Sequence, residues 1–103
     1  MIIKSTRHES KKLRDSARGR DCQIRIPGIC NFNPETVVLC HLNGGGSGTK
    51  HSDLFGAFGC SDCHSAVDGR IKTEYSKAEL DLMLLEAMVR TQKIWLDEGL
   101  VKI

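Results

Sequence analysis

Four cysteines form two pairs whose spacing suits a bound metal ion. Cys60 and Cys63 are separated by two residues, and Cys22 and Cys30 lie on either side of a Pro-Gly corner. If the fold brings the two pairs together, four thiolates give the tetrahedral donor set that structural Zn²⁺ sites use. We therefore predict a structural zinc site that ties the N-terminal segment to the middle of the chain.

Two other interpretations of these cysteines stay open. Cys60 and Cys63 could form a redox pair of the thioredoxin type, although the βαβ pattern that this motif requires is missing. Cys22 and Cys30 could be small buried apolar residues. The fifth cysteine, Cys40, follows an apolar run and is expected to pack in the core.

A second group of residues that could do chemistry runs through the middle of the chain. A histidine ends an apolar run and is followed by a glycine-rich loop, a second histidine, a carboxylate and a Cys-x-x-Cys-His sequence. These residues are Cys40-His41, Asn43 to Thr49, His51, Asp53 and Cys60 to His64. An imidazole exchanges protons near neutral pH and can act as a general base. The loop lacks the G-x-x-x-x-G-K-[ST] spacing of a nucleotide-binding P-loop.

On these motifs, the segment from Cys22 to about Gly69 resembles the HNH endonucleases, also called His-Me finger or ββα-metal nucleases. The resemblance implies that His41 takes a proton from the attacking water and that His64 binds a catalytic divalent ion, Mg²⁺ or another. Asp53 stands where the family has an asparagine that orients the loop and the base, so it could orient His41 or bind the metal directly.

Further motifs resemble a family of small phage and prophage proteins to which a nuclease role is attributed. They are the Arg-Gly-Arg-Asp-Cys-Gln start, the Ile-Pro-Gly-Ile-Cys-Asn corner and the segment from Arg90 to Leu96. This second resemblance covers most of the chain. It implies the same activity in a phage or prophage protein.

The sequence departs from the HNH pattern at the residue before the expected base. That residue is often a metal-binding carboxylate or histidine, and here it is Cys40, whose thiolate is a poor ligand for Mg²⁺. His51 or Asp68 could supply the missing ligand. Alternatively, His64 could be a zinc ligand in place of a distant cysteine, and His41 could be a hydrogen-bonded residue without a catalytic role.

Positive charge is concentrated near the N-terminus. The net charge is +2, but residues 1–30 contain eight basic and three acidic side chains. A basic segment on a near-neutral chain suggests a polyanion such as nucleic acid, although a solvated segment without a partner would look the same. The arginines expected to contact a nucleic-acid backbone are Arg14, Arg18, Arg20 and Arg25.

Periodicity and turn residues predict the elements that must position these groups. Helices are expected over Ser10–Gly19, from Ser61 or Asp62 to about Val67, and over Ser76–Glu98. Strands are expected over Gln23–Ile29, Thr36–Leu39, Leu54–Gly59 and Leu100–Ile103. The strand ending at Leu39 would deliver Cys40 and His41. Aromatic residues are few, so a metal would compensate for a thin core.

The sequence thus predicts an α+β fold with one domain over residues 1–103. Residues 1–9 would be a flexible tail, residues 22–69 a zinc-stapled ββα core and residues 76–98 a long amphipathic helix. The predicted function is a metal-dependent endonuclease acting on nucleic acid, with DNA preferred. The alternative is a non-catalytic zinc module that binds nucleic acid or a partner protein. We expect a soluble, cytoplasmic protein with no membrane partner, and the oligomeric state stays open.

Overall fold

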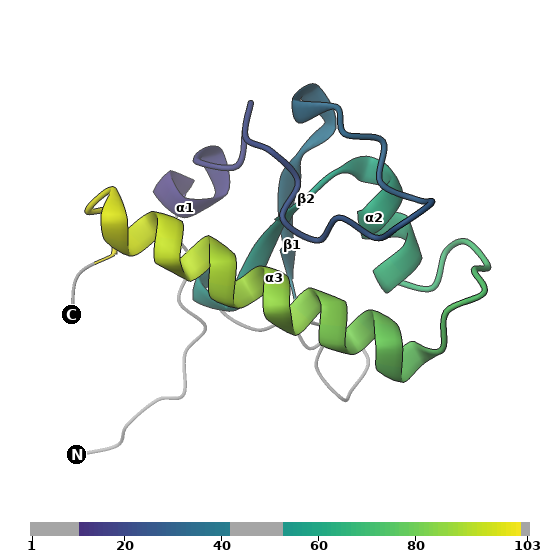
Figure 1. Ribbon diagram of the computed structural model, residues 1–103. Coiled ribbons are helices and arrows are strands. Elements are labelled where there is room, and N and C mark those ends of the chain that lie inside the picture. The colour runs from purple at the N-terminus through teal and green to yellow at the C-terminus, as the bar shows by residue number, and fades with distance from the viewer. Residues whose placement is uncertain (1–10, 42–52, 102–103) are drawn as a thin grey trace, which may run out of the picture.

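The computed structural model describes residues 11–41 and 53–101 (Figure 1). They form an α+β structure with a two-stranded antiparallel sheet. The strands are β1 (Val38–His41) and β2 (Gly56–Gly59), and the α-helices are α1 (Lys11–Asp15), α2 (Ser61–Val67) and α3 (Lys77–Asp97). Short 3-10 helices, η1 (Pro34–Thr36) and η2 (Asp53–Phe55), precede the two strands. Within these residues, no helix is both long and apolar enough to cross a membrane.

The side chains of Ile24 and Cys40 lie close to the backbone of the hairpin at Gly59. This residue pairs with Val38 in the sheet, while His41 pairs with Gly56 at the other end. A Cβ atom at Gly59 would lie 2.5 Å from Cδ1 of Ile24 and 2.7 Å from Sγ of Cys40. The glycine that makes β2 look like a weak strand therefore lets the chain around Ile24 pack directly on the sheet.

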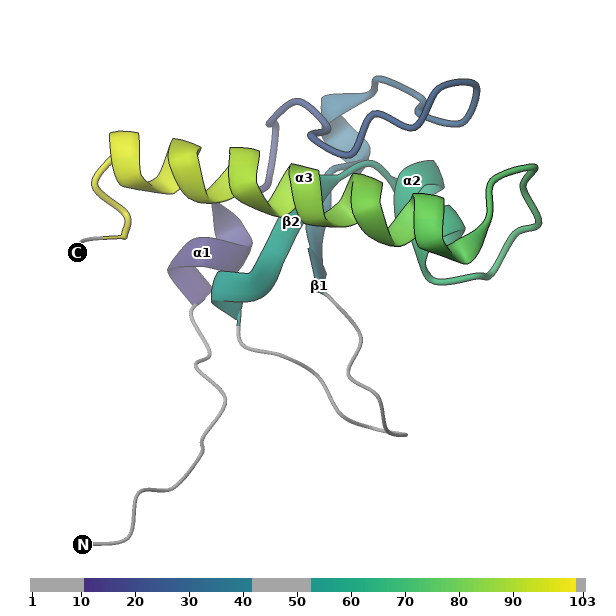
Figure 2. The ribbon, with the colours of Figure 1, turned by 60° about the horizontal axis from the view of Figure 1, so that its bottom comes forward.

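Helix α3 lies across the sheet, with α1 near one end and α2 near the other (Figures 1 and 2). A capping box between Ser76 and Glu79 starts the helix, and Gly99 ends it with a φ of +74°. Trp95 is fully buried and meets the ring of Phe58 edge-on, with the ring centres 5.8 Å apart. The long helix thus supplies most of the apolar surface that covers β2.

The predicted strand over Gln23–Ile29 is wrong. The segment is a series of turns in which Arg25 and Gly28 have positive φ angles of 50° and 79°. The backbone N–H groups of Ile29 and Cys30 both donate to the carbonyl of Ile26, which curls the chain back. This curl carries Cys22 and Cys30 toward α2, which an extended strand would not do.

The other element boundaries differ modestly from the predictions. Helix α1 is shorter than Ser10–Gly19 because the chain turns after Asp15. Residues 36 and 54–55 belong to the 3-10 helices and not to the strands. Leu100 and Val101 are not in a strand, because their N–H groups donate back to the carbonyl of Trp95. The helices over 61–67 and 77–97 match the predictions closely.

Candidate active site and thiol cluster

A histidine and a buried aspartate meet at the end of the hairpin. Nε2 of His41 lies 2.5 Å from Oδ1 of Asp53, whose side chain has no exposed surface. An ionised carboxylate can only accept hydrogen bonds, so the shared proton belongs to Nε2. This leaves Nδ1 as the ring atom with a lone pair, on an imidazole that keeps 17% of its surface exposed.

An arginine holds the same carboxylate from the other side. Nη1 of Arg14 lies 2.7 Å from Oδ2 of Asp53, and the Arg14 side chain stays 42% exposed. Burying a carboxylate is costly unless cations and hydrogen bonds compensate it. Asp53 therefore links α1, η2 and the end of β1, which lie far apart in the sequence.

The element that carries Asp53 is itself anchored on the long helix. Nε2 of Gln92 on α3 donates a hydrogen bond of 2.9 Å to the carbonyl of Leu54, the residue after Asp53. His41 is the last residue of β1, so its backbone is fixed by pairing with Gly56. Both partners of the contact are thus held by regular structure.

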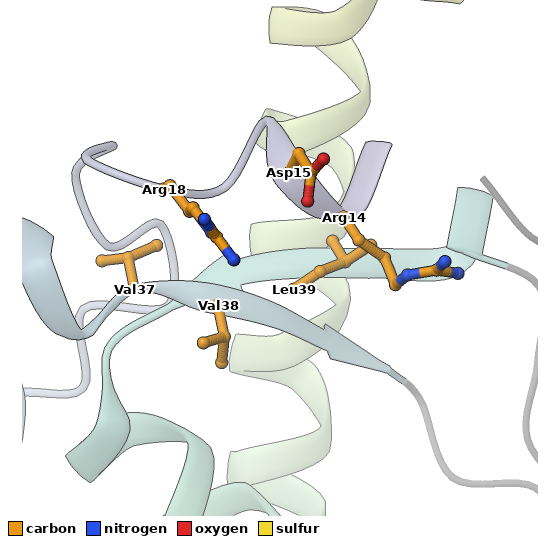
Figure 3. Close-up of a pocket in the computed structure, with 6 residues that line it drawn as sticks. All are labelled: Arg14, Asp15, Arg18, Val37, Val38 and Leu39. Carbon is orange, nitrogen blue, oxygen red and sulfur yellow. The ribbon is translucent and has the colours of Figure 1, made fainter. Parts of the chain in front are cut away.

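A groove lies beside this contact, between the α1 region and β1 (Figure 3). Its volume is about 310 Å³, and its lining residues are Arg14, Asp15, Arg18, Val37, Val38 and Leu39. Figure 3 shows Arg14 and Arg18 extending from the α1 region toward β1. Two guanidinium groups at one groove provide donors with the geometry that phosphate oxygens accept.

Helix α2 carries a second polar pair. Nε2 of His64 lies 3.1 Å from Oδ2 of Asp68, one helical turn later, and Nη2 of Arg70 lies 3.4 Å from the same oxygen. The side chains of His64 and Asp68 are partly exposed, so solvent or a ligand can reach them. An imidazole and a carboxylate on one helix face are both suitable ligands for a divalent ion.

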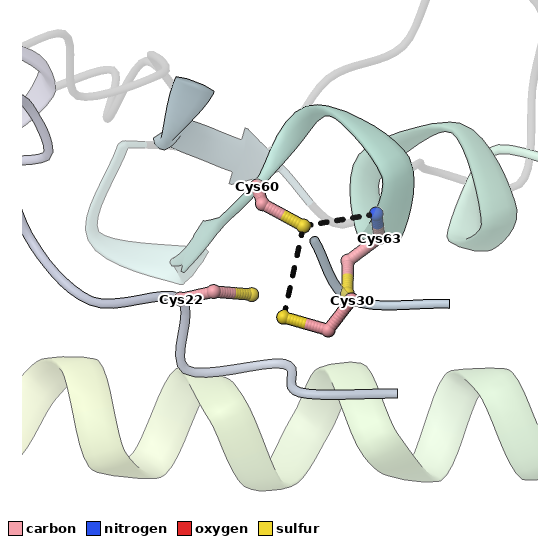
Figure 4. Close-up of side chains that lie close together, drawn as sticks. All are labelled: Cys22, Cys30, Cys60 and Cys63. Atoms are coloured by element: carbon pink, nitrogen blue, oxygen red, sulfur yellow. Dashed lines mark hydrogen bonds between the residues drawn. The ribbon is translucent and has the colours of Figure 1, made fainter. Parts of the chain in front are cut away.

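The two pairs of cysteines come together at the start of α2 (Figure 4). The sulfur atoms of Cys22, Cys30, Cys60 and Cys63 all lie within 4.8 Å of one another. Cys60 caps α2, and its sulfur accepts a hydrogen bond from the backbone N–H of Cys63. The prediction that these four residues meet is confirmed. They are also the largest ligand group found in the part of the chain that the structure describes.

The electrostatics of this cluster favour a bound cation. A hydrogen bond between the side chains of Cys22 and Cys63 lowers the pKa of Cys22 and raises the pKa of Cys63. Burial raises the pKa of Cys30 to about 11. If all four thiols were ionised, the thiolates would repel one another, and a bound cation would offset their charge. The donor set therefore fits a metal such as zinc.

Cys40 is not part of the cluster. It is fully buried in the sheet, where its sulfur lies 3.8 Å from the carbonyl oxygen of Gly59. Burial raises the pKa of its thiol well above the ordinary value. The expectation that Cys40 packs in the core agrees with this position.

A known family accounts for most of the chain. The family model described as "Putative nuclease YbcO" matches residues 11–100. The chain belongs to the YbcO family.

Two YbcO relatives and one solved structure are similar to the chain. Proteins named "Putative nuclease YbcO", from Escherichia coli strain K12 and from Enterobacteria phage 82, are each 49% identical over 96 residues. Each alignment covers 87% of this chain and 96% of the relative. A solved structure described as "a putative bacteriophage protein from Escherichia coli str. K-12 substr. MG1655" matches with a TM-score of 0.72 and 44% identity, covering 85% of this chain and all of that chain.

In this YbcO-family chain, most of the predicted arginines contact other parts of the protein. Arg20 donates two hydrogen bonds to the carboxylate of Glu98, and Arg25 donates to the carbonyl of Cys22. Arg14 holds Asp53, whereas Arg18 lines the groove. Their contact with nucleic acid stays a prediction. His51 lies outside the described residues.

Sequence reasoning missed two partners of the predicted residues. The pairing of Arg14 with Asp53 joins positions 39 apart, and no local spacing signals it. The pairing of Arg70 with Asp68 was also missed. The i, i+4 spacing of His64 and Asp68 had been used, since Asp68 was already a candidate ligand beside His64.

Proposed function

We propose that this YbcO-family chain is a metal-dependent endonuclease of the HNH type that hydrolyses phosphodiester bonds in DNA. The observation that carries the proposal is the contact between His41 and the buried Asp53 at the end of a β-hairpin that leads into α2. The nuclease names of the relatives support the reaction class. The order of elements, β1, β2 and α2, supports the HNH type.

His41 is assigned the role of general base. With Nε2–H donating to Asp53, the lone pair on Nδ1 can accept a proton from a water molecule next to a phosphodiester. The buried carboxylate fixes the tautomer and the ring orientation, and it stabilises the imidazolium that forms when the proton is taken up. Arg14 keeps Asp53 in place and is assigned the role of a positioning residue.

His64 and Asp68 are assigned to the catalytic divalent ion. Their side chains lie on one face of α2, and both keep some exposure. A divalent ion bound there would offset negative charge on the scissile phosphate and on the leaving oxygen. His64 and Asp68 pair with each other, and Arg70 shares the carboxylate of Asp68. His51 remains a further candidate ligand.

Cys22, Cys30, Cys60 and Cys63 are assigned to a structural Zn²⁺. Cys60 and Cys63 form the first turn of α2, and His64 is the next residue. Fixing the thiolates would therefore fix the position of His64, because the helix begins at the cluster. The same site would fasten the irregular segment from Cys22 to Cys30, which has few backbone hydrogen bonds of its own.

A plasmid-nicking assay tests the proposal. Supercoiled DNA is incubated with wild type, His41→Ala and His8→Ala in Mg²⁺ and in Mn²⁺, with an RNA of matched length as a second substrate. His8 has no role predicted from the sequence, so His8→Ala controls for loss of a histidine. We expect wild type and His8→Ala to nick DNA and His41→Ala to nick it at least about 100-fold more slowly.

The alternative, a non-catalytic zinc module, predicts a different result. In that case wild type nicks no more than His41→Ala, and metal analysis finds one tightly bound zinc with no second divalent site. Cleavage of RNA but not DNA would keep the catalytic assignment and correct the substrate.

A further inference from the structure

Helix α3 is apolar on two opposite faces. Its inner face, which includes Leu84, Met88 and Trp95, is buried against the sheet. On the other side, four large apolar side chains are 40–61% exposed. They are Leu82, Leu85, Val89 and Leu96, here called the outer stripe. Steps of three, four and seven residues place them along one line of the helix.

A row of exposed apolar side chains on a surface helix marks a contact with another molecule. The outer stripe points away from the protein's own core, because it lies on roughly the opposite side of the helix from the residues that are buried against the sheet. It therefore cannot be covered by the sheet on which α3 already packs.

Two residues of the stripe are placed symmetrically about Val89, whereas the position that mirrors Leu85 is occupied by Lys93. Leu82 lies seven residues before Val89, and Leu96 lies seven residues after it. If a second α3 packs antiparallel with a two-fold axis beside Val89, each Leu82 meets Leu96 of the other copy, and the two Val89 side chains meet at the axis. A two-fold interface requires a surface that complements itself in this way.

A cavity lies beside Leu96, at the end of the stripe that would receive Leu82 of the second copy. It has a volume of about 250 Å³ and opens beside Leu96, with Leu54, Phe55, Gln92 and Val101 as its other lining residues. Phe55 is 42% exposed there. The two-fold axis brings Leu82 of the second copy, which is 57% exposed, to this end of the helix. A projecting leucine and an apolar hollow thus lie at equal distances from the axis.

Charges beside the stripe select the antiparallel direction. Glu86 and Lys93 are exposed and flank the same edge of the stripe, three residues before and four residues after Val89. In the antiparallel arrangement, Glu86 of each copy lies beside Lys93 of the other, which also pairs with Asp97 of its own helix. A parallel arrangement would place Glu86 beside Leu85 of the other copy. Opposite charges that flank an apolar seam set the orientation of paired helices.

We propose that the chain forms a symmetric dimer in which the outer stripes of two α3 helices pack antiparallel around Val89. The proposal does not depend on the nuclease assignment, because the stripe lies on the face of α3 opposite the sheet.

Sedimentation equilibrium of the full chain over a range of concentrations tests the dimer. Val89→Glu places two like charges at the axis and should raise the dimer dissociation constant by more than about tenfold. Ile71→Glu, at an apolar residue that is 43% exposed but outside the stripe, is the matched control and should leave the dimer intact. Circular dichroism checks that both variants keep the wild-type helix content.

A charge swap tests the direction of packing. Glu86→Lys and Lys93→Glu should each weaken the dimer, and the double variant should restore it. As a second measurement, Val89→Cys should be cross-linked to a dimer by a short bismaleimide, whereas wild type should not. A wild-type chain that stays monomeric at every concentration overturns the proposal and leaves the stripe to a different protein. A dimer that Val89→Glu does not weaken also overturns it.

Discussion

His41 and Asp53 form a hydrogen bond of 2.5 Å between an imidazole that solvent reaches and a carboxylate that solvent does not reach. The other oxygen of Asp53 accepts a hydrogen bond from Arg14. A buried charge is retained only when its partners compensate the loss of hydration. One carboxylate therefore aligns the proposed base and also joins the N-terminal helix to the hairpin.

Asp53→Asn tests the orientation of the base. The amide is nearly the same size, but its neutral group stabilises neither the imidazolium of His41 nor the guanidinium of Arg14. We expect the DNA nicking rate to fall by about 100-fold or more. The rate is measured at saturating DNA alongside a thermal melt. A variant that melts earlier but nicks at the wild-type rate would remove Asp53 from the mechanism.

Arg14→Gln and Arg18→Gln separate positioning from phosphate contact. Arg14→Gln should lower the free energy of unfolding by about 1–3 kcal/mol, because it removes a charged hydrogen bond to a buried carboxylate. Arg18→Gln should leave stability unchanged. It should reduce the slope of log DNA affinity against log salt by about one. Urea unfolding and fluorescence anisotropy give the two quantities, and the reverse pattern would contradict both assignments.

The cysteine cluster predicts one tightly bound zinc per chain. Cys60→Ala should lose this metal and unfold at lower temperature, because metal-binding free energy contributes to folding. Cys40→Ala is the control, since Cys40 lies outside the cluster and should keep the metal. Metal analysis by mass spectrometry measures the stoichiometry. If Cys40→Ala lost the zinc and Cys60→Ala kept it, the ligand assignment would be wrong.

The pair formed by Arg20 and Glu98 predicts a pH dependence. Hydrogen bonds from Arg20 hold the pKa of Glu98 below its usual value of 4.5. Because the folded-state pKa is lowered, the pair stabilises the protein above that value, and the contribution is lost as the pH falls through the folded-state pKa. Wild type should therefore unfold at higher urea than Arg20→Gln near neutral pH. Below about pH 4 the difference in urea midpoint between wild type and Arg20→Gln should shrink. A difference that grows would contradict the assigned role of the pair.

The sequence predicted the parts of the fold that depend on local signals. The stop at Gly99 and the start of α3 at Ser76 both use capping residues next to the elements they limit. Helix α2 was also predicted, but its N-cap is Cys60 and not the expected Ser61 or Asp62. The hairpin was predicted from two short apolar runs. The meeting of the four cysteines was predicted because their donor chemistry has few other uses in one small chain.

The structure corrected predictions that depend on distant partners. Residues 23–29 alternate like a strand, yet they form turns, and the N–H of Gln23 donates a hydrogen bond to the carbonyl of Phe58 in β2. The contact of Arg14, Arg20 and Arg25 with nucleic acid stays a prediction, but each of them also contacts another group of the chain, which the sequence did not show. Neither a pattern of charge nor its spacing shows which carboxylate or carbonyl lies opposite in space.

Chemical rescue of His41→Ala by imidazole tests the central claim most directly. If His41 takes a proton from water beside the scissile phosphate, then added imidazole should restore metal-dependent DNA nicking to His41→Ala in proportion to its concentration. It should not restore nicking to His64→Ala, which is proposed to lack a metal ligand. A wild type that nicks no faster than His41→Ala, or equal rescue of both variants, would contradict the assignment of His41 as the general base.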